Sequence, residues 1–218
     1  MSDAVSGIGW RLILARLETA IAVNSLAAGA ELTERVLARC VSADEAAVRF
    51  DLLPDAVLIT IEPPNRQLTD REVDLARAIS AAASDLGART VSEVSGSVPW
   101  VVQGVEFAID AMDIDAVRPF WRAVLGYVDA PDGSLYDPGH RGFAVWFQQM
   151  DELRTQRNRI HFDVVVPHDR AQERIAATLS AGGTLVSDTQ APAFWVLADV
   201  EGNEVCVCTW QGRDADPG

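Results

Sequence analysis

The chain has 218 residues, which allows one large domain or two small ones. A hydrophobic content of 49% with 23% charged residues excludes a disordered or fibrous protein. The net charge of −14 argues against nucleic-acid binding, which needs a basic surface, and the absence of lysine excludes Schiff-base chemistry and a P-loop lysine.

Three cysteines are too few and too oddly placed for a disulfide framework. No apolar run approaches the roughly 18 residues that a membrane helix requires, and the N-terminus has no signal-peptide pattern. We therefore expect a cytoplasmic protein with reduced thiols that does not bind membranes.

The first 87 residues predict a domain of mixed α and β structure. Apolar runs and helical spacing indicate two short strands within residues 10–23, for which a helix is the alternative, and a helix over residues 25–40. Strands are expected over residues 48–53 and 56–62.

The next helix has recognisable signals at both ends. Thr69 and Glu72 have the spacing of a capping box, and apolar residues follow at helical intervals from Val73 to Leu86. Gly87 lies just past the last of them, where helices commonly end.

A change of composition then divides the chain. Residues 88–99 read ARTVSEVSGSVP, a run of small and polar residues that is typical of a linker. The sequence therefore predicts a first domain over residues 1–87, a linker over 88–101, a second domain over 102–212 and a tail over 213–218.

The second domain contains an internal repeat. VEFAIDAMDIDAVRPFWRAVLGY predicts a strand, a turn and an amphipathic helix, and IHFDVVVPHDRAQERIAATLSAGG repeats that order, with His161 in the position of Glu106. Short strands follow each copy. The pattern predicts two βαβββ units in tandem, and an α+β fold class for the whole chain.

The first domain resembles the pterin carbinolamine dehydratase family over roughly residues 8–87. The resemblance rests on WRLIL, the two strands that follow the first helix, and LTDREVDLARAI. The family's adjacent histidines before a proline would fall near Ser42 to Val48, where this chain reads SADEAAV, and all three histidines lie beyond the linker. Since histidine supplies groups that titrate near neutrality, we expect this domain to keep the shape without the chemistry.

The second domain resembles the vicinal oxygen chelate superfamily over about residues 103–210. The strings FWRAVLGY, NRIHFDV and DVEGNEVCV carry the match. The superfamily contains glyoxalases, extradiol dioxygenases, fosfomycin-modifying enzymes and bleomycin-resistance proteins. The resemblance implies that the paired βαβββ units form an open barrel whose concave face holds a ligand.

Metal-dependent members of that superfamily carry one ligand on the first and one on the last strand of each unit. These positions fall on Glu106 and His161 for the first strands, and on Gln148 or Gln149 and on Cys206 for the last. Such donors span hard to soft, a set that no common catalytic metal prefers, although zinc could accept Glu106, His161 and Cys206. We expect no cofactor; a divalent metal, if it binds, is expected on Glu106 and His161.

Tryptophan is the second candidate feature of this domain. Trp146 and Trp195 lie on predicted barrel strands, and an indole ring offers a flat face for stacking as well as an N–H donor. Filling of the core is the alternative for both rings. The predicted ligand-contacting residues are Glu106, Trp146, Gln148, His161, Asp163, Trp195 and Cys206.

Three loop residues complete the candidates. His140 lies in a glycine- and proline-containing loop, where we expect it to be solvated unless the loop borders the ligand cavity. Asp199 and Glu201 flank the glycine-asparagine turn and are expected to be exposed.

These observations favour a non-catalytic protein that sequesters a hydrophobic or aromatic small molecule, in the manner of a bleomycin-resistance protein that withholds an antibiotic. Resemblance to that type implies a homodimer. The acidic surface would favour cationic ligands at long range. The alternatives are a metal-dependent lyase, isomerase or dioxygenase of the glyoxalase superfamily, and a residual 4a-hydroxytetrahydrobiopterin dehydratase.

Overall fold

The computed structural model describes residues 1–39, 47–95, 100–102, 105–153, 162–209 and 211. The chain divides into two units, Met1–Gly104 and Val105–Gly218, and each has its own hydrophobic core. Among the described residues, no helix is both long and apolar enough to cross a membrane.

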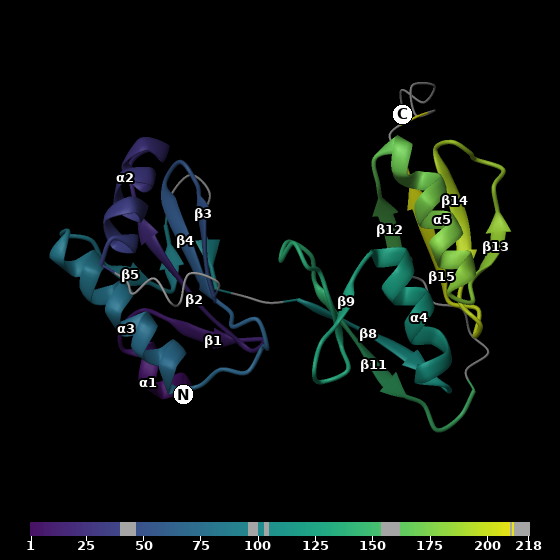
Figure 1. Ribbon diagram of the computed structural model, residues 1–218, viewed down its shortest axis with the longest axis horizontal. Helices are drawn as coiled ribbons and strands as arrows, with labels where there is room; N and C mark the ends of the chain where they lie inside the picture. Colours follow the sequence, from purple (N-terminus) through teal and green to yellow (C-terminus); the bar gives the residue numbers. More distant parts are fainter. Residues whose placement is uncertain (40–46, 96–99, 103–104, 154–161, 210, 212–218) are drawn as a thin grey trace. The chain divides into compact units, whose positions relative to one another are not determined.

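Unit 1 is an antiparallel sheet with helices packed on one face (Figure 1). The sheet order is β1-β2-β4-β3, and β5 also pairs with β2. Its main elements are α1 (Ser2–Ser6), β1 (Arg11–Ile13), β2 (Arg16–Ala22), α2 (Leu26–Leu37), β3 (Val48–Leu52), β4 (Ala56–Ile61) and α3 (Asp70–Asp85). Two strands rather than a helix thus occupy residues 11–22, and α1 has no counterpart among the predicted elements.

The core of unit 1 follows from strand alternation. Leu17 and Ile21 of β2 and Ile59 of β4 point to the helix face, where they meet Val73 and Ile79 of α3. α3 begins with the predicted capping box: the Thr69 hydroxyl accepts a hydrogen bond from the Arg71 backbone, and the Glu72 carboxylate accepts one from the Thr69 backbone at 2.7 Å.

The stretch expected to be a linker is partly strand. β5 (Thr90–Val91) joins the sheet, and β6 (Glu93–Val94) pairs with β7 (Trp100–Val101). Val94 is buried with Ala20 and Ala56. The division between the units therefore falls after Gly104, and all of the described part of residues 88–101 belongs to unit 1. Small and polar residues mask this strand pairing in the sequence.

Unit 2 contains two βαβββ units, as the internal repeat predicts. The first comprises β8 (Glu106–Ala111), α4 (Ile114–Leu125), β9 (Val128–Asp129), β10 (Leu135–Tyr136) and β11 (Ala144–Gln149). The second comprises β12 (Phe162–Val165), α5 (Ala171–Ser180), β13 (Thr184–Ser187), β14 (Phe194–Ala198) and β15 (Glu204–Cys208), with a short 3₁₀ turn, His168–Arg170, before α5.

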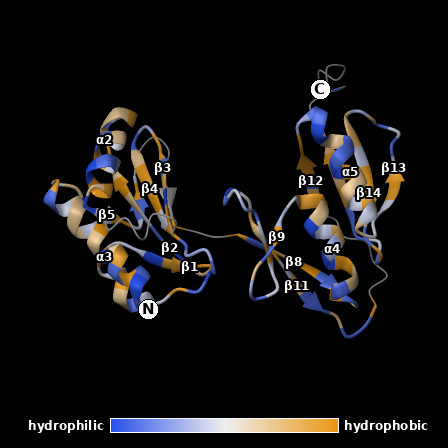
Figure 2. Ribbon diagram, in the orientation of Figure 1, coloured by the Kyte–Doolittle hydropathy of each residue, from blue (hydrophilic) through white to orange (hydrophobic). Residues whose placement is uncertain are grey.

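Each βαβββ unit forms one four-stranded mixed sheet. The orders are β8-β11-β10-β9 and β12-β15-β14-β13, in which the first and last strands of each unit pair in parallel. No ladder joins the two sheets in the described part of the chain, so they do not form a closed barrel there. Figure 2 shows that hydrophobic residues are concentrated on the strands, while the helices carry both kinds.

The two halves of unit 2 share one core. Phe162 of β12 packs edge-on against Phe107 of β8, with ring centroids 4.9 Å apart, and against Trp121 of α4 at 5.8 Å. α4 also contacts α5, because Arg174 Nη1 donates to the carbonyl of Val124 at 2.9 Å. These contacts place the shared core on the helix-facing side of both sheets. The opposite faces of the two sheets are open.

Candidate functional site

The open face of the first sheet carries three of the predicted ligand-contacting residues. Phe107 and Ile109 of β8 pack in the core, so alternation turns Glu106 to the other face. On β11, Trp146 and Gln148 share that face, and both are exposed. Trp146 is 40% exposed, an unusual position for so large an apolar ring. The structure therefore places Glu106, Trp146 and Gln148 on one solvent-facing surface.

The open face of the second sheet carries Asp163 and Cys206. These residues are direct neighbours in the parallel pairing of β12 with β15, and Phe162 and Val205 beside them face the core. The Cys206 thiol donates a hydrogen bond to the Asp163 carboxylate. Burial of the sulfur, together with the negative charge of Asp163, raises the pKa of Cys206 to about 12. The thiol is consequently neutral near pH 7 and is a poor nucleophile.

Trp195 lies on the opposite face from these residues. It is 9% exposed, pairs with Val207 and packs in the shared core with Leu197. Alternation correctly predicts that Trp195 and Leu197 share a face, but that face is the core rather than the ligand surface. For Trp195 the structure shows the alternative, filling of the core. His161, the remaining predicted contact, lies outside the described residues.

Two described members of the predicted metal set already have other partners. The Cys206 thiol has a raised pKa beside Asp163, so binding of a metal ion there would have to release its proton. The Gln149 amide is engaged elsewhere, since its Nε2 donates to the carbonyls of Met112 and Met150 at 2.9 and 3.0 Å. Within the described residues, no three His, Cys, Asp or Glu side chains are close enough together to hold an ion.

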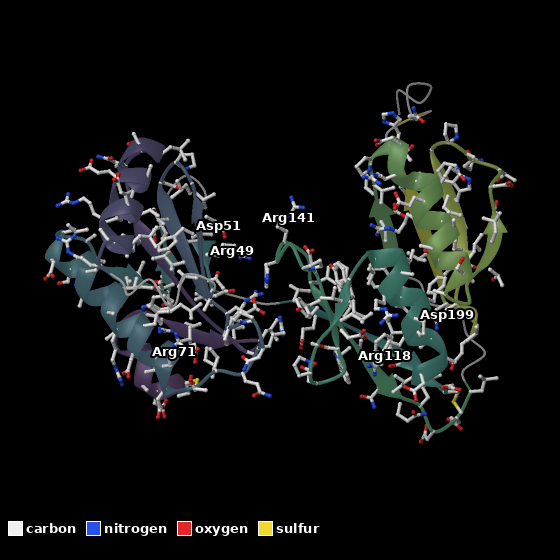
Figure 3. The ribbon with its side chains drawn as sticks, in the orientation of Figure 1. Arg49, Asp51, Arg71, Arg118, Arg141 and Asp199 are labelled. Atoms are coloured by element: carbon white, nitrogen blue, oxygen red, sulfur yellow. The ribbon has the colours of Figure 1, made fainter. Side chains whose placement is uncertain are left out.

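Asp199 is buried, contrary to the expectation that it is exposed. It is 3% exposed, and its carboxylate accepts hydrogen bonds from Trp121 Nε1 at 3.0 Å, Asn203 Nδ2 at 2.8 Å, and the backbone of Glu201 and Asn203. Figure 3 shows Asp199 beside α4. Glu201 in turn accepts from the backbone of Met112 and Asp113, just before α4 begins. The turn after β14 thereby fastens the second βαβββ unit to the first.

Sequence reasoning also passes over Tyr136. Its neighbour Leu135 is fully buried in the core, so Tyr136 belongs to the same open face as Trp146. The available signal is the alternation around Leu135, but β10 has only two residues, too few to show a period.

The family match lies within unit 2. Residues 106–208 match the family described as "Glyoxalase-like domain". No curated protein matches the chain significantly.

Several solved structures are similar to about half of the chain. A glyoxalase-related enzyme from Fulvimarina pelagi is 15% identical, with 49% of this chain and 87% of that chain covered and a TM-score of 0.41. A glyoxalase/bleomycin resistance protein/dioxygenase family enzyme from Burkholderia phytofirmans PsJN is 19% identical, with 48% and 95% covered and a TM-score of 0.38. The fosfomycin resistance protein FosX from Mesorhizobium loti is 13% identical, with 50% and 92% covered and a TM-score of 0.38.

The family match covers both βαβββ units and ends at the last residue of β15. It does not extend to unit 1, where the dehydratase resemblance stays a prediction. Residues 106–208 therefore form a glyoxalase-like domain.

Proposed function

We propose that the chain is a non-catalytic binding protein whose unit 2 holds a planar aromatic small molecule on the open face of its first sheet. The observation that carries this proposal is the 40% exposure of Trp146, on a face that β8 and β11 otherwise line with polar side chains and alanine. Full burial of an aromatic side chain removes roughly 150–250 Å² from water. The 40% of Trp146 that is exposed therefore leaves an area on the order of 100 Å² that a stacked ligand would cover.

The chemistry around Trp146 suits binding better than turnover. Glu106 and Gln148 lie on the same face as Trp146, and their carboxylate and amide can orient a ligand by hydrogen bonds. The Cys206 thiol on the second sheet is protonated and therefore does not supply a nucleophile at neutral pH. The net charge of −14 would draw cationic ligands toward the molecule, an effect that salt weakens.

Under this proposal the chain withholds its ligand from a target, as a self-resistance protein withholds an antibiotic. Unit 1 would be an inactive domain with a dehydratase-like shape, which is supported by the absence of histidine from residues 1–104 of the sequence. The proposal includes a homodimer.

Titration with three planar probes of different charge tests the proposal: 9-aminoacridine (cationic), quercetin (neutral) and 8-anilinonaphthalene-1-sulfonate (anionic). We expect at least one probe to bind with a micromolar Kd, to quench tryptophan fluorescence, and to be recovered chemically unchanged after prolonged incubation. Failure of all three to bind contradicts the proposal.

The main alternative, a metal-dependent lyase or isomerase, is separated by elemental analysis. Protein purified without chelators or a metal-affinity tag is expected to hold no stoichiometric iron, zinc, nickel or manganese, even after incubation with each ion. One tightly held ion per chain, removed by chelation together with an activity, would replace the binding proposal with Glu106 and His161 as the candidate ligands.

A further inference from the structure

Two further aromatic side chains adjoin the open face that carries Trp146. Leu135 of β10 pairs with Val145 of β11, and both are fully buried in the core. The next residue, Tyr136, therefore lies on the open face. Continuing the antiparallel register sets Tyr136 opposite Ala144 and diagonal to Trp146. Diagonal neighbours in a sheet are about 7–8 Å apart, within reach of aromatic side chains.

The third ring belongs to the loop after β10. The ring of His140 packs against that of Tyr136, with centroids 6.1 Å apart and planes inclined by 41°. His140 has φ of 53°, in the left-handed region that residues other than glycine seldom occupy. Such strained positions persist where the surrounding structure holds them, and they cluster at sites that bind ligands.

Asp137 holds this loop in place. Its carboxylate accepts backbone hydrogen bonds from Gly139 at 2.8 Å and from Arg141 and Gly142 at 2.9 Å each. Burial alone would raise the pKa of this carboxyl, but the three N–H donors outweigh it, and the pKa lies below its ordinary value. The carboxylate is thus ionised at neutral pH and holds the loop backbone in this conformation.

A close contact seats the loop on the body of the domain. A Cβ atom at Gly142 would lie 2.0 Å from the hydroxyl oxygen of Tyr127, so a larger residue there would displace the Tyr127 side chain. Arg141 extends from the tip of the loop (Figure 3). The ring of His140 is consequently presented by a backbone that is fixed before any ligand arrives.

We propose that Tyr136 and His140 are specificity-determining residues that extend the stacking surface of Trp146 into an aromatic strip, which selects extended planar ligands of two or more fused rings. This inference rests on the proposed function, because it names further contacts of the same surface. A prearranged strip loses little conformational entropy on binding. The added ring contacts therefore lower the Kd instead of offsetting an ordering cost.

His140→Gly gives the sharpest test. Glycine adopts a φ of 53° without strain, so the variant loses the ring while the loop keeps its backbone. We expect an unchanged or higher Tm and at least a fivefold weaker Kd for the probe that the wild-type chain binds best. Tyr136→Leu is expected to weaken binding similarly, and Tyr136→Phe, which keeps the ring, to bind within twofold of wild type. Val200→Ala, in the exposed turn after β14, is the control.

Trp146→Ala, measured alongside, distinguishes failure of the aromatic strip from failure of the proposed function. Weaker binding in Trp146→Ala, His140→Gly and Tyr136→Leu supports the aromatic strip. If Trp146→Ala is weakened while His140→Gly and Tyr136→Leu bind as wild type, the strip is refuted and the proposed function stands. If Trp146→Ala binds as wild type, or the wild-type chain binds none of the three probes, both proposals fail.

Discussion

Asp199 is a buried charge whose carboxylate is satisfied entirely by neighbours in the fold. It accepts from the indole of Trp121, from both the backbone and the side chain of Asn203, and from the backbone of Glu201. Replacing it by alanine would leave the Trp121 and Asn203 donors buried without acceptors, at about 1–3 kcal/mol for each. We predict that Asp199→Ala lowers the free energy of unfolding of unit 2 by about 3–5 kcal/mol, as measured by urea denaturation.

Asp151→Ala is the matched control, since Asp151 is exposed. This variant should lie within about 0.5 kcal/mol of wild type. A loss below 1 kcal/mol for Asp199→Ala would mean that the turn after β14 does not hold the two βαβββ units together.

Cys206 provides a second prediction, about reactivity. Because burial and Asp163 raise its pKa to about 12, very little thiolate is present at pH 8. We expect iodoacetamide to alkylate Cys206 at least 100-fold more slowly in the folded chain than in urea, as measured by mass spectrometry in a Cys40→Ser/Cys208→Ser background. Asp163→Asn should accelerate the reaction, because it removes the opposing charge. Equal rates in the folded and unfolded chains would contradict the assigned environment.

The same shift predicts a pH dependence of stability. The folded state holds the Cys206 proton more tightly than the unfolded chain, where a thiol has its ordinary pKa near 9. The stabilisation is therefore complete below about pH 9 and is lost as the pH rises from 9 toward 12. Cys206→Ser should make the fall in Tm between pH 9 and pH 12 less steep. If Tm falls with pH as steeply in this variant as in the wild type, Cys206 is not the source of the pH dependence.

For individual residues, the sequence predicts which side chains share a strand face better than it predicts which face is buried. Alternation correctly groups Trp146 with Gln148 and Trp195 with Leu197, because side chains on a strand alternate whatever surrounds it. Which group faces the core depends on where the helices pack. The burial of Asp199 likewise depends on Trp121, which lies far away in the sequence.

Among the secondary-structure elements, the end of α4 requires glycine for its backbone conformation and also lies close to α5. Gly126 caps α4 with φ of 70°, and a Cβ atom there would lie 2.7 Å from a guanidinium nitrogen of Arg174. Gly126→Ala would therefore add left-handed strain and also displace the Arg174 donor from the Val124 carbonyl. We predict a loss of about 2–3 kcal/mol in the free energy of unfolding of unit 2.

Gly87→Ala is the matched control, because Gly87 has φ of 76° and open space around its Cβ position. It should cost only the strain, about 1–2 kcal/mol in unit 1. In an Arg174→Ala background, Gly126→Ala should fall to this value, since the clash is removed. An additive double mutant would show that Arg174 and Gly126 are not coupled.

The capping box of α3 gives a prediction for unit 1. Glu72 is partly desolvated, which by itself raises its pKa, but the donors of Thr69 outweigh this and the pKa is lowered. Its contribution to stability is present above its unfolded pKa near 4.5 and is lost as the pH falls. Thr69→Ala should cost about 1 kcal/mol at pH 7 and reduce the acid sensitivity of unit 1. If Thr69→Ala is as stable as the wild type at both pH 7 and pH 4, the capping box does not contribute to the stability of unit 1.

Elements with strong local signals are predicted well, and short elements that depend on pairing are not. α3 has a capping box and sustained helical spacing, so local chemistry alone defines it. β5, β6 and β7 have two residues each, and their partners determine them, which is why the sequence there reads as a linker. The βαβββ repeat is visible because two copies of one pattern reinforce each other.

At the scale of the whole molecule, two separate cores predict two independently folding units. Unit 1 buries its core between one sheet and its helices, and unit 2 buries its own between two sheets and α4 and α5. We expect fragments 1–104 and 105–218 each to fold cooperatively, and fragment 105–218 to retain probe binding within threefold. Loss of binding in a folded fragment 105–218 would show that unit 1 completes the site.

The decisive measurement is the affinity of Trp146→Ala for the planar probe that the wild-type chain binds best. Tryptophan at the centre of a contact commonly contributes about 2 kcal/mol or more to binding, so we predict that Kd rises about 30-fold. Tm should fall only slightly, because Trp146 lies outside the core and is 40% exposed in the free chain. Val200→Ala should bind as wild type. A Trp146→Ala variant with the wild-type Kd would contradict the assignment of the open face of the first sheet as the ligand-binding surface.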